Sequence, residues 1–234
     1  HCSALATDRY DTASCEPAVN AYRVTAEVSG DGSVGAYSTG IFYIEDCDFI
    51  SNGSGAAVIE GTNFITLVNT DMTVTLAGKY GVMVYQSMSG DALGNTGTFD
   101  MEGGSITVNG GPILLNTNDE AYFTLEDVVL RGSDVILQTG KINWGATATN
   151  GGVSHFTAVN QDMEGDFIVD GYGNITALFS NGSSLVGAID PDNSTNQNTG
   201  SIKGGHVSLT IDATSTWKAD ADSWVDELTL STIS

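Results

Sequence analysis

The stretch "FDMEGGSITVNGGPILLNT" (residues 99–117) aligns, with small gaps, with "FTLEDVVLRGSDVILQT" (residues 123–139). Each copy holds a six-residue box with an apolar residue at both ends, then a Gly-bearing or polar turn, then a second apolar run. Alternation of apolar and polar residues is typical of short strands that bury one face. The two boxes, "MEGGSI" and "LEDVVL", start 24 residues apart. This pair predicts a repeated unit built from strands.

The same box occurs along much of the chain. The other copies are "IEDCDF" from Ile44, "LVNTDM" from Leu67 and "AVNQDM" from Ala158, and successive starts lie 23, 34, 24 and 33 residues apart. Later, "FSNGSSLVGAI" (179–189) parallels "IDATSTWKADA" (211–221). Such periods are typical of solenoids, whose repeats stack to bury a continuous core. We therefore expect the apolar residues that open the boxes to lie in one inward row: Ile44, Leu67, Met101 and Leu125.

The longer intervals predict loops inserted between strands. The candidate loops are polar and rich in Gly: "SMSGDALGNTG" (87–97), "KINWGATATNGG" (141–152) and "DPDNSTNQNTGSIKGG" (190–205). Such loops usually carry the specificity of a solenoid. No helix of convincing periodicity appears, and the best local candidate, around Pro17 to Tyr22, is weak. An all-β sandwich is the rival fold, and the offsets of 23 and 24 residues argue against it.

The boxes "IEDCDF", "LVNTDM" and "LEDVVL" resemble those of the right-handed parallel β-helix of the pectate-lyase-like superfamily. The C-terminal stretch "VSLTIDATSTWKADADSWVDELTLS" (207–231) is similar to the final coils of secreted microbial surface proteins, which are often adhesin-like. The resemblance covers residues 35–234 and implies an all-β chain with a single right-handed parallel β-helix (solenoid). It implies that Val207, Leu209 and Ile211 face inward, and that Trp217 and Trp224 plug or flank the open end of the core.

Residues 1–34 are expected to form an N-terminal capping segment before this domain. Cys2 and Cys15 bracket a stretch without a strong strand pattern, and a disulfide between them would staple the cap in an oxidising compartment. The third cysteine, Cys47, lies in "YIEDCDF", where a small inward-facing residue fits. It is interpreted as a buried free thiol, with an interchain bridge as the alternative.

The charge of the chain limits its partners. Seven basic and 29 acidic residues give a formal net charge of −22. Such a surface repels nucleic acid and anionic membranes, and no apolar run is long enough for a membrane span. Clustered carboxylates make Ca²⁺ the one candidate cofactor, against the alternative that they only solvate the surface. The candidate calcium ligands are Asp162, Asp166, Asp190 and Asp192.

Two features of the sequence indicate possible contacts with carbohydrate: glycosylation sequons and a tryptophan in a candidate loop. Asn-x-Ser/Thr sequons mark four candidate glycosylation sites, Asn52, Asn174, Asn181 and Asn193, which matter only if the source glycosylates its proteins. Trp144, in a candidate loop, is a candidate contact for an extracellular glycan, because an aromatic ring can stack on a sugar.

No catalytic residue is predicted. A polysaccharide lyase would need a base beside carboxylates, but the basic residues are scattered, and only Arg131 falls close to a box. The leading hypothesis is a non-enzymatic structural or adhesive protein, secreted to the extracellular space or cell surface. It would assemble with copies of itself into a filament, sheath or layer, or contact glycans or a surface receptor. The alternatives are a calcium-assisted carbohydrate-binding module and, second, a polysaccharide lyase.

Overall fold

The structure is a computed structural model that describes residues 3–7, 17–87, 92–141, 151–192 and 205–231. Its regular elements are strands, and no helix occurs in these ranges, so none there could cross a membrane. Every pair of neighbouring strands is parallel. The chain is therefore all-β with parallel sheets, as the repeat predicts.

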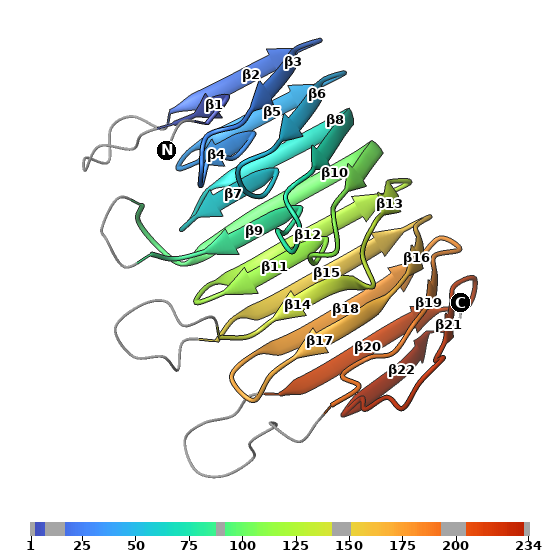
Figure 1. Cartoon of the computed structure of the whole chain (residues 1–234). Coiled ribbons are helices and arrows are strands. Elements are labelled where there is room, and N and C mark those ends of the chain that lie inside the picture. Colours follow the sequence, from blue (N-terminus) through green and yellow to red (C-terminus); the bar gives the residue numbers. More distant parts are fainter. Residues whose placement is uncertain (1–2, 8–16, 88–91, 142–150, 193–204, 232–234) are drawn as a thin grey trace.

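Two long sheets run along the molecule (Figure 1). Sheet A contains, in spatial order, β1 (Leu5–Ala6), β4 (Ala36–Ser38), β7 (Ala57–Glu60), β9 (Val82–Tyr85), β11 (Leu114–Thr117), β14 (Val135–Thr139) and β17 (Asp166–Val169). Sheet B contains β2 (Ala18–Tyr22), β5 (Ile41–Glu45), β8 (Phe64–Val74), β10 (Thr96–Thr107), β12 (Glu120–Glu126), β15 (Val153–Val159), β18 (Asn174–Ser180), β20 (His206–Asp212) and β22 (Glu227–Ser231). The strands of one sheet alternate along the chain with strands of the others.

A third side is formed by shorter strands. Its first part holds β3 (Thr25–Val28), β6 (Asp48–Ser51), the second halves of β8 and β10, and β13 (Val129–Arg131). Its second part is a separate sheet of β16 (Asp162–Glu164), β19 (Ser184–Val186) and β21 (Thr216–Lys218). The third side is thus divided between β13 and β16, while sheets A and B continue past that point.

The register confirms the predicted inward row. Ile44 pairs with Leu67, Leu67 with Met101, and Met101 with Leu125. All four are at most 2% exposed. The predicted correspondence between residues 179–189 and 211–221, which lie 32 positions apart, is also confirmed. Phe179 pairs with Ile211, and Leu185 pairs with Trp217. The apolar side chains of successive strands therefore stack into one core, which is where most of the folding free energy of such a chain arises.

The corner after each sheet B strand explains the polar residues of the boxes. Asp46, Asn69, Asp127, Asn160 and Asn181 all have positive φ, between 46° and 56°. Asn and Asp adopt this left-handed conformation more readily than other residues with a Cβ atom. At Gly104 (φ 76°) an added Cβ would lie 2.1 Å from the carbonyl oxygen of Thr70, so only glycine fits. The boxes thus encode both the strand and its turn.

The N-terminal segment contributes strands. The weak helix candidate at Pro17 to Tyr22 is wrong, because Ala18–Tyr22 forms strand β2 and Ala21 pairs with Ile44 of the next strand. Strands β1, β2 and β3 pair with the strands of the following layer, β4, β5 and β6, so the described part of residues 1–34 lies at one end of the stack. A capping role for this segment stays a prediction. Cys2 and Cys15 lie outside the described residues.

Cys47 is a free thiol and is 5% exposed. Its sulfur accepts the backbone N–H of Val24 at 3.3 Å and donates to the carbonyl oxygen of Glu45 at 3.2 Å. Its own N–H donates to Oγ1 of Thr70 at 3.3 Å. The corner residues of three layers are thus connected through Cys47, and an interchain bridge from this position would require the corner to open.

Candidate functional site

The C-terminal end of the stack is the most exposed part of the core. Strand β22 pairs with β20 and ends sheet B in the described part of the chain. Leu228 and Leu230 continue the inward rows of Leu209 and Ile211, their partners in β20. Leu209 and Ile211 are 1% and 7% exposed, whereas Leu228 and Leu230 are 52% and 70% exposed. The last strand therefore presents core-type side chains to solvent.

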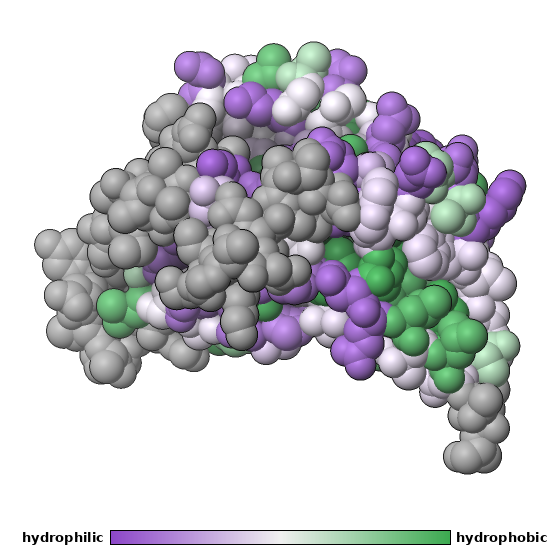
Figure 2. Space-filling view, turned by 90° about the horizontal axis from the view of Figure 1, so that it is seen from below, coloured by the Kyte–Doolittle hydropathy of each residue, from purple (hydrophilic) through white to green (hydrophobic). Residues whose placement is uncertain are grey.

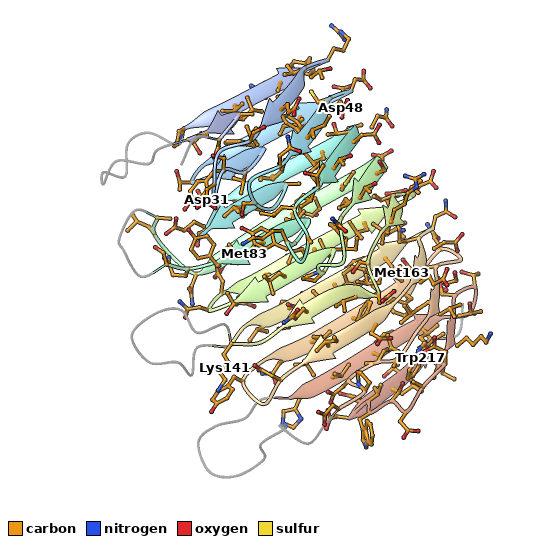
Figure 3. All side chains as sticks on the ribbon, in the orientation of Figure 1. Asp31, Asp48, Met83, Lys141, Met163 and Trp217 are labelled. Carbon is orange, nitrogen blue, oxygen red and sulfur yellow. The ribbon has the colours of Figure 1, made fainter. Side chains whose placement is uncertain are left out.

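The two tryptophans lie near this end, as the resemblance implies. Trp217 of β21 packs against the core, and its indole N–H donates to the carbonyl oxygen of Gly187 at 3.0 Å (Figure 3). Trp224 is 41% exposed. Figure 2 looks onto this end and shows apolar side chains gathered next to polar ones. The end of the stack is an apolar surface next to β22, whose outer edge pairs with no other strand among the described residues. Such an edge is a template for pairing with another chain.

A groove marks the division of the third side. Two adjoining hollows of about 480 and 470 Å³ lie between β13 and the sheet of β16 and β19, and both are bordered by Leu130, Glu164 and Val186. The carbonyl oxygen of Arg131 accepts the N–H of Val108, so the alternating backbone of β13 turns the polar groups of Leu130 toward the groove. Directly after β16, the N–H of Gly165 donates to the carbonyl oxygen of Val186 in β19. By the same alternation, the backbone N–H and C=O groups of Asp162 and Glu164 point the other way, toward the groove. The groove is lined by strand edges.

Both ends of this groove are closed by hydrogen bonds. At one end the buried side chain of Gln161 contacts both backbone groups of Val128. At the other end the N–H of Asp166 donates to the carbonyl oxygen of Asp134 at 2.8 Å. Arg131 borders the larger of the two hollows together with four carboxylates, Asp134, Glu164, Asp166 and Asp220. It is the basic residue that the sequence places close to a box.

Two of the candidate calcium ligands already accept hydrogen bonds from the protein. Asp162 accepts the hydroxyl of Ser184 at 2.6 Å, and Asp166 accepts the N–H of Ala188 at 2.8 Å. Asp190 is buried and Asp192 is exposed. Within the described ranges, no three His, Cys, Asp or Glu side chains are placed to hold a metal ion. A calcium site at these residues stays a prediction.

The carbohydrate candidates are placed only in part. Asn181 is exposed at a corner, whereas Asn52 donates to Glu27 at 2.7 Å and accepts from Thr75 at 2.6 Å. Asn174 is half-buried, and its side chain accepts the N–H of His206 at 3.3 Å. Among these three, Asn181 is the most accessible to a glycosyltransferase. Asn193 and Trp144 lie outside the described residues.

The outer face of sheet A holds a buried acid that the sequence does not reveal. Glu60 is 1% exposed and accepts hydroxyl hydrogen bonds from Tyr37, Tyr85 and Ser87. The two tyrosine oxygens lie 2.5 Å apart. Burial, with the neighbouring Glu60, raises the pKa of Tyr37 well above its usual range, and burial raises that of Tyr85. Val58 and Met83 pack in the apolar cluster around them. This arrangement is a satisfied polar contact that holds three strands together.

A scan against protein-family models finds no match for this chain. Searches of curated proteins and of solved structures find none either.

Proposed function

We propose that the chain is a single right-handed parallel β-helix that serves as a non-enzymatic structural or adhesive module outside the cell. In this proposal copies of the chain associate end to end, and the C-terminal end of the stack is one of the contacting surfaces. The proposal is carried by the exposure of Leu228 and Leu230 on β22, the strand that ends sheet B in the part of the chain that the structure describes.

The partner that fits this end is a second copy of the chain. Within the stack, each strand of sheet B accepts the next strand in parallel, with apolar residues in register. At the opposite end, β2 supplies a parallel strand of the same direction, with Val19 and Ala21 in the inward positions. Contact between β22 of one copy and β2 of the next would continue the ladder. Such head-to-tail contacts do not close and generate filaments.

Sedimentation velocity over a concentration series tests the contact. The double variant Leu228→Lys/Leu230→Lys places two ammonium groups in the inward row and should sediment as a single species. The matched control is Thr229→Lys, since Thr229 lies between the two leucines and points to the other face of the strand. We expect wild type and control to associate as concentration rises. Equal association of the double variant would contradict the proposal.

The groove supports a second candidate function, polysaccharide binding or cleavage. Arg131 beside Asp134 and Glu164 places a cation among carboxylates, the residue types that lyase chemistry requires. Incubation with polysaccharides and measurement of absorbance from unsaturated products tests this candidate. Product formation that is lost in Arg131→Met would favour it over the structural proposal.

A further inference from the structure

A small pocket lies where the chain passes from sheet A into sheet B. Its volume is about 350 Å³, and its walls include Asn95, Asn118, Asp119, Glu120, Gly152 and Tyr172. An added Cβ on Gly152 would lie 2.7 Å from the side-chain nitrogen of Asn116, so glycine is needed for the backbone to approach this closely. The pocket is thus built from the corners of four successive layers, which precede β10, β12, β15 and β18.

Asp119 is the unusual residue of this pocket. Its side chain is 5% exposed, and Oδ1 accepts the N–H of Glu120 at 2.8 Å. Oδ2 has no hydrogen-bond partner among the described residues, and neither does the buried Oδ1 of the adjacent Asn116. Buried oxygens without a donor are rare in folded proteins and cost free energy. Two acceptors without donors, close to one pocket, indicate a ligand that brings donors.

No cation of the described residues neutralises Asp119. The Nε2 atom of His155 pairs with Oε1 of Glu120 at 2.9 Å, and its ring stacks on Tyr122. Lys141 places its ammonium group over the ring of Tyr172, 4.3 Å from the centroid. The ammonium group of Lys141 is therefore held by the ring of Tyr172, at the rim of the pocket. The carboxyl group of Asp119 has no cationic partner among the described residues.

We propose that this pocket binds the primary ammonium group of a small ligand, with Asp119 as its charge partner and Tyr172 at the rim. An ammonium group supplies three donors and no acceptor, which matches a site with unsatisfied acceptors. Its hydrogen bond to a carboxylate is charge-assisted and about twice as strong as a neutral one. The net charge of −22 attracts cationic ligands to the surface in general.

Calorimetric titration with matched probes tests the site. The ammonium probes are n-butylammonium and glucosamine, and the neutral probes of the same shape are n-butanol and glucose. We expect one molecule of each ammonium probe to bind per chain, with at least tenfold weaker binding of the neutral probes. Asp119→Asn keeps the shape of the side chain and should reduce ammonium binding at least tenfold. Asp71→Asn removes an equal charge from the exposed third side and should leave it unchanged.

A second measurement is made on the wild-type protein, with Asp119→Asn as its comparison. Burial raises the pKa of Asp119 to about 7, so ammonium binding should expel a proton from the wild-type protein near that pH. The heat of binding should then depend on the ionisation heat of the buffer. Five other titratable groups lie at or beside this site, and the Asp119→Asn comparison separates their contributions: Glu120, Lys141, His155, Asp170 and Tyr172. Binding of glucose as tight as glucosamine would overturn the proposal, as would absence of ammonium binding or full binding in Asp119→Asn.

Discussion

The side chain of Gln161 hydrogen-bonds both backbone groups of Val128. Its Oε1 accepts the N–H of Val128 at 2.8 Å, and its Nε2 donates to the carbonyl oxygen at 2.7 Å. The same Nε2 lies 2.9 Å from the carbonyl oxygen of Asp162. The side chain of Gln161 therefore makes the hydrogen bonds between two layers that a neighbouring strand would otherwise make, at the point where the third side divides.

Replacement of Gln161 should destabilise the fold. Gln161→Ala leaves the buried N–H and C=O of Val128 without partners, at a cost of about 2–3 kcal/mol in the free energy of unfolding. Urea denaturation monitored by circular dichroism measures the difference. The control is Gln138→Ala, since Gln138 lies on the outer face of sheet A and is half-buried. A loss as large in the control as in Gln161→Ala would show that the bridge contributes nothing of its own.

Asp119 should make stability depend on pH. Its pKa rises from 3.8 to about 7 on folding, chiefly because burial disfavours the charged form. Between these values the folded chain binds a proton that the unfolded chain has released. The contribution of Asp119 is therefore fully present below pH 3.8 and is lost as the pH rises toward 7. The free energy of unfolding should fall over this window more steeply in wild type than in Asp119→Asn. Parallel curves for the two proteins would mean that Asp119 titrates normally.

Cys47 should resist alkylation in the folded protein. With 5% exposure and two hydrogen bonds to its sulfur, the thiol is reached only when the corner opens. Iodoacetamide treatment followed by peptide mapping should find Cys47 unlabelled in buffer and labelled in urea. Rapid labelling in buffer would place the thiol at the surface and restore the interchain bridge as a serious alternative.

Glu60 should be important for stability although it does not line the proposed pocket or groove. Glu60→Ala removes the acceptor that Tyr37, Tyr85 and Ser87 share, and about 3 kcal/mol of unfolding free energy should be lost. Glu60→Gln keeps one acceptor oxygen and should lose less. Thermal denaturation of the two variants gives the order. An alanine variant as stable as wild type would show that the hydroxyls find other partners at no cost.

The stacking register could be predicted from the sequence because it depends on side-chain volume and on the alternation of apolar and polar residues. The inward residues Ile44, Leu67, Met101 and Leu125 are large, apolar and spaced at the repeat. A shift of one residue would turn the whole row to solvent, so few other pairings are stable. The 32-residue offset near the C-terminus is encoded in the same way and also holds.

Other features depend on contacts that no local pattern encodes. Strand β2 was hidden because Val19 and Ala21 make only a short apolar row, which becomes inward-facing by pairing with β5. The groove arises because sheets A and B continue past β13 while the third side does not. The burial of Asp119 and Glu60 depends on which loops and strands lie beside them. A carboxylate in a sequence gives no sign of such burial.

Electron microscopy of the purified chain, beside the Leu228→Lys/Leu230→Lys variant, tests the central claim most directly. The proposed end-to-end association predicts filaments or short chains of rods for wild type, with a repeat along the strand-stacking direction, and single rods for the variant. Single rods in both samples, at concentrations where other contacts would form, would contradict end-to-end association.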